Sequence, residues 1–200
     1  YAHRIEKQVA YLIAHPDTIM VGSQATVIDK TGRIVGTKSV PTNHDAIYEQ
    51  YGIVHPMIHP SVMIRRSLLP DPNKIYTHKW GVNDDYSSFF RLLNHGRFAN
   101  LPETLLKYRV HEGNSSLQHL KSKFLKITMI RIEAITKGGY RAPFILFPVM
   151  ALQALIVLIP PEPVLRELFC YLRGMKRVKM PSIKAFADRI PRLRLPLAYR

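Results

Sequence analysis

The strongest candidate for acid–base chemistry in this sequence is the run Asn83-Asp84-Asp85-Tyr86. It follows a loop that contains Gly81, and the apolar spacing after it predicts a helix, so both carboxylates stand at a helix N-terminus. Adjacent carboxylates repel each other, whereas a helix N-terminus favours their charged form. Such a pair can keep one carboxylate ionised and placed to accept a proton. N-capping is the commoner role of aspartate here, and the local pattern alone favours it.

Histidines offer a second set of candidate groups, but they are scattered along the chain. His59 precedes Pro60 at the start of an apolar run, and His111 precedes an acidic residue and a glycine. Each has the chemistry to bind a metal or a substrate, although a single histidine is more often a hydrogen-bonded structural residue. The sequence has no H-x-x-H pair, glycine-rich phosphate loop or G-x-S-x-G. Cys170 is the only cysteine, which excludes an internal disulfide and disfavours a cysteine-built metal site.

Helices and strands alternate along the part of the chain that carries these groups, which predicts an α/β fold. Predicted helices cover residues 2–15, 45–51, 84–96 and 115–136, and predicted strands cover 18–29, 33–35, 59–65, 97–101 and 105–110. The first helix has an apolar stripe formed by Ile5, Val9, Leu12 and Ile13. The helix that begins at Asp84 should bury Tyr86, Phe89, Phe90 and Leu93.

The C-terminal third differs in composition from the rest. The net charge is +15, of which residues 1–100 carry +3 and residues 101–200 carry +12. No charged residue lies between Arg141 and Glu162, and the apolar run 144–159 would span about 24 Å as a helix. A bilayer core needs about 30 Å, so this run is marginal as a membrane span. A basic tail after an apolar segment favours an anionic membrane surface over nucleic acid as the partner, with an ordinary buried helix as the alternative.

Six ordered blocks in residues 3–116 resemble the second half of bacterial family 2 glycosyltransferases of the GT-A fold. The blocks are His3-Arg4-Ile5-Glu6-Lys7-Gln8, Tyr11-Leu12 with His15-Pro16, Val21-Gly22-Ser23, His59-Pro60-Ser61-Val62-Met63, Asp84-Asp85-Tyr86, and Asn100-Leu101-Pro102-Glu103 leading to Tyr108-Arg109-Val110-His111. The resemblance implies a partial GT-A-like mixed sheet with flanking helices, followed by C-terminal helices. Residues 1–116 would form the acceptor-side part, and residues 117–200 a helical, apolar and basic membrane-associating extension.

In the family, the block that resembles HRIEKQ follows an aspartate motif, D-x-D, which holds a divalent cation and the nucleotide diphosphate. This chain starts after that position, so we expect a truncated enzyme whose nucleotide-binding half, and most of whose Mg²⁺ or Mn²⁺ site, is missing. We expect no turnover by the fragment alone.

The resemblance also implies roles for single residues in an inverting reaction. Asp85 would be the base that deprotonates the acceptor hydroxyl, with Asp84 as its supporting partner. The other implied roles are substrate contacts in the acceptor pocket for His59 and Ser61, a contact with the diphosphate for Arg109, and a late metal ligand for His111.

The predicted function is sugar transfer from a nucleotide-sugar donor to a saccharide or lipid-linked acceptor in cell-surface polysaccharide synthesis. The predicted location is the cytoplasmic side of the plasma membrane, with peripheral contact or a single anchor. A non-catalytic membrane-binding module, in which Asp84 and Asp85 only cap a helix, is the alternative. We expect no nucleic-acid partner, because the tail lacks the interleaved aromatic residues of a nucleic-acid-binding module.

Overall fold

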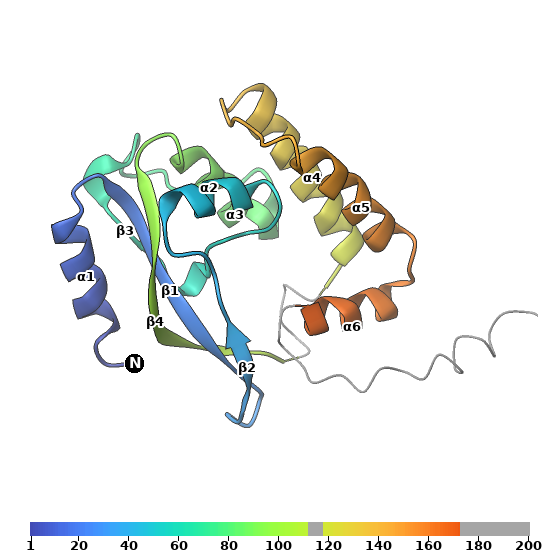
Figure 1. Ribbon diagram of the computed structural model, residues 1–200, viewed down its shortest axis with the longest axis horizontal. Helices are drawn as coiled ribbons and strands as arrows, with labels where there is room; N and C mark the ends of the chain where they lie inside the picture. The colour runs from blue at the N-terminus through green and yellow to red at the C-terminus, as the bar shows by residue number, and fades with distance from the viewer. Residues whose placement is uncertain (112–117, 173–200) are drawn as a thin grey trace, which may run out of the picture.

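The computed structural model describes residues 1–111 and 118–172. A four-stranded sheet forms the centre of this part of the chain, and β1 (Thr18–Ile28) is its central strand. β4 (Arg97–Arg109) runs parallel to one edge of β1, while β2 (Ile34–Lys38) and β3 (Met63–Ile64) pair antiparallel with the two ends of the other edge. This mixed sheet with flanking helices confirms the predicted α/β fold class (Figure 1).

Helices cover both faces of the sheet and extend beyond it on one side (Figure 1). One face carries α1 (Arg4–Ala14), and the other carries α2 (His44–Tyr51) and α3 (Asp84–Leu92). Outside α3 lie α4 (Leu120–Thr136), α5 (Leu146–Leu158) and α6 (Glu162–Leu172). Neighbouring residues on a strand point to opposite faces, so Met20 packs in the core beside α3 whereas Val21 packs beneath α1.

The apolar core beside α3 also includes residues of the C-terminal helices. Ile130 of α4, Tyr140 and Leu146 belong to the same buried cluster as Tyr51 and Phe90. The predicted boundary between residues 116 and 117 falls outside the described residues. The described parts on its two sides therefore share one core.

The prediction of a buried strand over residues 59–65 is wrong. His59–Ser61 forms a 3-10 turn, and only Met63–Ile64 pairs as a strand. Pro60 explains the difference, because it has no backbone N–H for a strand ladder but is well suited to the start of a helical turn. The turn changes the direction of the chain immediately after His59.

Two strands were predicted on either side of Pro102, but the structure has one continuous strand. Leu101 pairs with Ser23 and Thr104 pairs with Gln24, so Pro102 and its neighbour form a bulge between them. The side-chain amide of Gln24 donates to the Leu101 carbonyl oxygen at 3.0 Å and so bridges the irregularity.

Helix boundaries agree better than the strand predictions. All four residues predicted for the buried face of α3, which are Tyr86, Phe89, Phe90 and Leu93, are buried. In α1, by contrast, only Leu12 of the predicted apolar stripe is buried, and Gln8 takes the other inward position. The helix predicted from residue 115 begins at Leu120, and residues 115–117 lie outside the described part. No helix among residues 1–111 and 118–172 is long and apolar enough to cross a membrane.

Candidate active site

Asp85 occupies the second position of α3 and is held by the backbone of its own helix. Its Oδ1 atom accepts a hydrogen bond from the Tyr86 N–H at 2.7 Å. Asp84, one residue earlier, faces the other way, and its Oδ1 accepts from the Trp80 N–H at 2.7 Å. The residue at the N-cap position is Asn83, whose side chain makes no capping hydrogen bond. The two carboxylates therefore have different surroundings: Asp84 fastens the preceding loop, and Asp85 has its second oxygen available.

Two histidines lie against that second oxygen. Asp85 Oδ2 is 3.4 Å from His59 Nδ1 and 3.8 Å from His55 Nε2. The far nitrogen of His59, Nε2, is 2.9 Å from the Tyr76 hydroxyl. If Tyr76 donates to Nε2, the His59 ring carries its proton on Nδ1 and can donate toward Asp85. The result is a line of polar groups from Asp85 through His59 to Tyr76.

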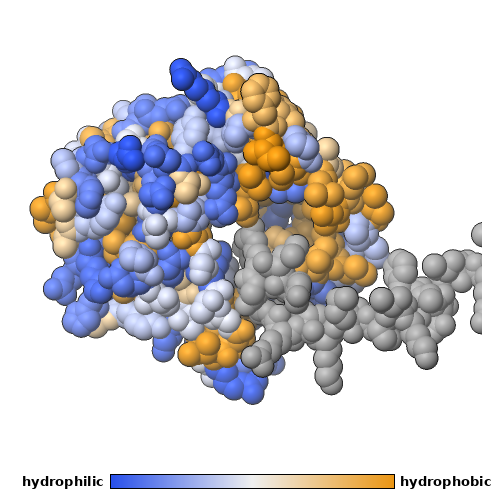
Figure 2. All heavy atoms as spheres, in the orientation of Figure 1, coloured by the Kyte–Doolittle hydropathy of each residue, from blue (hydrophilic) through white to orange (hydrophobic). Residues whose placement is uncertain are grey.

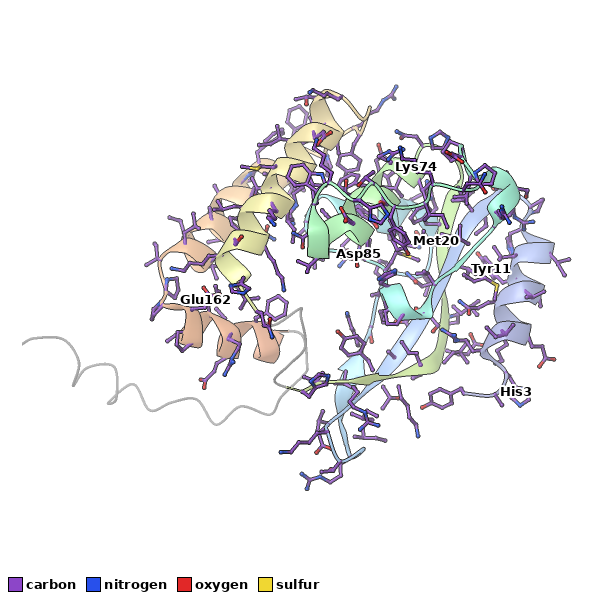
Figure 3. The ribbon with its side chains drawn as sticks, turned by 180° about the vertical axis from the view of Figure 1, so that it is seen from behind. His3, Tyr11, Met20, Lys74, Asp85 and Glu162 are labelled. Atoms are coloured by element: carbon purple, nitrogen blue, oxygen red, sulfur yellow. The ribbon has the colours of Figure 1, made fainter. Side chains whose placement is uncertain are left out.

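Aromatic side chains fix the orientation of both imidazole rings. Phe89, one helical turn after Asp85, lies 5.4 Å from the His59 ring and 5.9 Å from the His55 ring, with both pairs edge to face. The ring of His55 also lies 5.4 Å from that of Tyr86. Figure 3 shows Asp85 on the inner side of α3, toward the space between the sheet and the C-terminal helices.

Burial raises the pKa of Asp85 above its ordinary value of 3.8, although the Tyr86 N–H and the charge of His59 oppose the shift. Its side chain is 25% exposed, so it is partly desolvated but still reachable. Burial, followed by the negative charge of Asp85, also raises the pKa of Tyr76. A carboxylate with a raised pKa accepts a proton more readily than an ordinary aspartate does.

Ser61 supports this site from within the fold. The side chain is fully buried, and its hydroxyl donates to the Ile58 carbonyl oxygen at 2.7 Å and accepts from the Ser23 N–H at 3.1 Å. The buried amide of Gln8 donates to the carbonyl oxygens of Val21 and Ser61 at 2.9 and 2.7 Å. Ser61 and Gln8 thus hold the His59 turn against β1, and in this structure Ser61 presents no atom to a ligand.

Arg109 and His111 lie at the far end of the sheet. Arg109 is paired with Ile28, five residues beyond Ser23 on β1, which corresponds to about 17 Å of strand. Its guanidinium donates to the Asp29 and Lys30 carbonyl oxygens at 3.0 and 3.1 Å and so fastens the turn between β1 and β2. His111 follows the end of β4 and is exposed. The structure therefore brings together Asp84, Asp85, His59 and Ser61 but not Arg109 or His111.

Metal-binding groups do not cluster in this part of the protein. Across residues 1–111 and 118–172, no three His, Cys, Asp or Glu side chains lie close enough together to hold a metal ion. Asp85 with His55 and His59 comes nearest, but its distances are those of weak ion pairs.

Sequence reasoning missed His55, Tyr76 and Gln8. A repeated His-Pro pair, at His55 and at His59, is the one signal that marks His55 as a neighbour of the site. Tyr76 lies in the loop after Pro70, and no local pattern connects it with His59.

Comparison with known proteins relates this chain to glycosyltransferases. It is 27% identical over 107 residues to the amylovoran biosynthesis glycosyltransferase AmsE of Erwinia amylovora, which covers 53% of this chain and 39% of that protein. It is 32% identical over 116 residues to the O-antigen biosynthesis glycosyltransferase WbnJ of Escherichia coli, covering 56% and 44%. An uncharacterized glycosyltransferase of Methanocaldococcus jannaschii is 28% identical over 124 residues, covering 61% and 42%. The chain spans about two fifths of the length of these relatives. No protein-family model matches it.

Proposed function

We propose that this chain is the acceptor-side part of an inverting family 2 glycosyltransferase of the GT-A fold, with Asp85 as its catalytic base. The observation that carries the proposal is the half-buried Asp85 carboxylate, which has one oxygen fixed by the Tyr86 N–H and the other directed at His59. The relatedness to glycosyltransferases and the order of the matching blocks support the same reading.

In this mechanism Asp85 Oδ2 takes the proton of an acceptor hydroxyl while that oxygen attacks the anomeric carbon of the donor sugar. The bond between that carbon and the nucleotide diphosphate breaks, and the diphosphate oxygen leaves with the electron pair. His59 holds the Asp85 carboxylate in place, and the Tyr76 hydroxyl holds the His59 ring. Asp84 acts as the supporting partner by fixing the loop at Trp80.

A Mg²⁺ or Mn²⁺ ion would stabilise the departing diphosphate. The described residues do not form a site that fits such an ion alone, because no three ligand-type side chains cluster among them. We propose that an aspartate motif of a preceding nucleotide-binding half holds it, with His111 as a late ligand and Arg109 toward the diphosphate. Both residues would need a partner segment to complete that site.

The proposed donor is a nucleotide sugar, and the proposed acceptor is a saccharide or lipid-linked sugar of cell-surface polysaccharide synthesis. The names of two relatives, which refer to amylovoran and O-antigen biosynthesis, support this class of acceptor. We place the protein at the inner face of the plasma membrane, which agrees with the basic excess of its second half.

A non-catalytic membrane-binding module is the second candidate, and Asp85→Asn in the complete enzyme separates the two. Asparagine keeps the acceptor for the Tyr86 N–H but removes the base, so transfer should fall by about 10²–10⁴-fold while the fold is retained. Asp45→Asn is the matched control, because Asp45 is also the second residue of a helix but is largely exposed. Unchanged transfer by Asp85→Asn would eliminate the enzymatic assignment of this residue.

A further inference from the structure

The outer face of α5 carries a row of apolar side chains that nothing in the described part of the protein covers. These residues, the α5 stripe, fall within an arc of about 100° on the helix surface and are 39–74% exposed: Ile145, Leu152, Leu155, Ile156 and Ile159. Figure 2 shows apolar side chains gathered over α5 and over the segment that leads into it. Single exposed apolar residues are ordinary on protein surfaces, but a contiguous row of large ones marks an interaction surface.

Contacts on the inner side of α5 fix the direction in which the stripe points. The Gln153 amide donates to the Ile53 carbonyl oxygen at 3.0 Å, and its oxygen accepts from Arg131 of α4 at 2.8 Å. Leu146 at the start of the helix is fully buried in the central core. Because these residues hold one side of α5 against the protein, the stripe is held outward.

The sequence around the stripe has a strong charge pattern. No charged residue lies between Arg141 and Glu162. Residues 173–200, which follow α6, contain nine Lys or Arg residues and one Asp. An uncharged apolar helix next to a basic segment complements a surface that is apolar inside and anionic outside, which is the chemistry of an anionic lipid bilayer.

Two other ways of covering the stripe fit the structure less well. A segment that precedes Tyr1 would enter beside α1, and Figure 1 places that end of the chain across the sheet from α5. Insertion across the bilayer is disfavoured because α5 has 13 residues. That length corresponds to about 20 Å, against about 30 Å of hydrocarbon.

We propose that the α5 stripe lies in the interface of an anionic lipid bilayer, with α5 roughly parallel to the membrane surface. This inference rests on the proposed function only in that it explains how Asp85 would meet a lipid-linked acceptor. Membrane binding itself does not require Asp85.

The test compares vesicle binding by the protein and by two triple variants in a co-sedimentation assay. Leu152→Gln/Leu155→Gln/Ile159→Gln removes the centre of the stripe. Ile5→Gln/Val9→Gln/Ile13→Gln is the matched control, because it removes an equally exposed apolar row from α1. With phosphatidylglycerol-containing vesicles, we expect the α5 variant to bind about 100-fold more weakly, since each apolar side chain that enters hydrocarbon contributes about tenfold. The α1 variant should bind as the unchanged protein does.

Circular dichroism and light scattering complete the experiment. All substituted side chains are exposed, so each variant should keep its helical signal. Equal binding by the α5 variant and the unchanged protein would overturn the proposal. So would a dimer that dissociates only in the α5 variant, because the stripe would then contact a second copy of the chain. The protein with Asp85→Asn should bind vesicles normally, which separates this proposal from the catalytic one.

Discussion

Asp85 combines two properties that conflict in an ordinary surface carboxylate. It is partly buried, which raises its pKa, and it still has an oxygen that faces a histidine. A catalytic base benefits from both, because it must bind a proton in the transition state and release it afterwards. The structure also assigns different partners to the two adjacent aspartates, a distinction that residue type alone cannot make.

Burial of the Asp85 charge should make this residue costly for stability. Its pKa is higher in the folded protein than in the unfolded chain, so the folded state binds the proton more tightly. The carboxyl therefore favours folding in acid, and that contribution is lost as the pH rises through the folded-state pKa. We expect Asp85→Asn to raise the urea midpoint at pH 7, with the gain disappearing near pH 4. Asp45→Asn should change the midpoint little at either pH, and an unstable Asp85→Asn protein at pH 7 would contradict this reasoning.

Tyr76 should act on Asp85 only through the His59 ring. Tyr76→Phe removes the hydroxyl that lies 2.9 Å from His59 Nε2 and keeps the aromatic contact with Phe89. Loss of one hydrogen bond should lower kcat/KM of the complete enzyme by up to about tenfold. Nitrogen NMR should show a loss of the Nδ1–H tautomer of His59, a change that a purely structural role of Tyr76 would not produce. Tyr11→Phe, on the opposite face of the sheet, serves as the control.

Sequence patterns identified Asp85 and His59 but not the contacts that join them. Asp85 stands at a helix start, where type and position are both informative, and His59 was singled out because it precedes a proline. Tyr76 reaches His59 through a loop whose path depends on the tertiary structure. The same holds for Gln8, a polar residue that lies among apolar neighbours in α1 and is buried because two carbonyl oxygens need its amide.

Helices were predicted more accurately than strands because helical periodicity is local. The buried face of α3 follows from the spacing of its aromatic residues alone. β4, in contrast, continues through Pro102 only because Gln24 and the parallel register with β1 support the bulge. Such support comes from a strand about 80 residues away, and nothing near Pro102 in the sequence indicates it.

Arg131 of α4 should be the main polar link between the C-terminal helices and the rest of the protein. Its buried guanidinium donates to the side chains of Gln153 and Tyr86 and to the Ile53 carbonyl oxygen, all of which are neutral. Arg131→Met would leave these groups without their donor, at a cost of about 2–4 kcal/mol in the free energy of unfolding. Lys126→Met, at an exposed position of the same helix, is the control and should cost less than about 0.5 kcal/mol. Equal urea midpoints for the two variants would mean that Arg131 does not hold α4 in place.

The molecule as a whole behaves as one packed body in its described part, although its composition changes sharply along the chain. Charge and apolar content divide the sequence near residue 140, and a division into two parts follows naturally from composition. Packing crosses that division, because Tyr140 donates to the Tyr48 carbonyl oxygen at 2.9 Å and Leu146 lies close to Gly52. Composition reports the surface that a segment presents, whereas the core depends on contacts between distant segments.

Removal of the C-terminal helices should therefore unfold the part that carries Asp85. A chain that ends at residue 116 loses Ile130, Tyr140 and Leu146 from the core and uncovers Tyr86 and Phe90, which pack directly behind the site. Three large buried side chains contribute about 5–9 kcal/mol, which is comparable to the whole stability of a small domain. We expect this chain to aggregate or to lack a cooperative urea transition. A chain that ends at residue 172 keeps every residue of the described core and should unfold in one transition at the midpoint of the full chain. Cooperative unfolding of the shorter chain would show that residues 1–116 form an independent domain, and the C-terminal helices would then be an accessory to the site rather than part of its support.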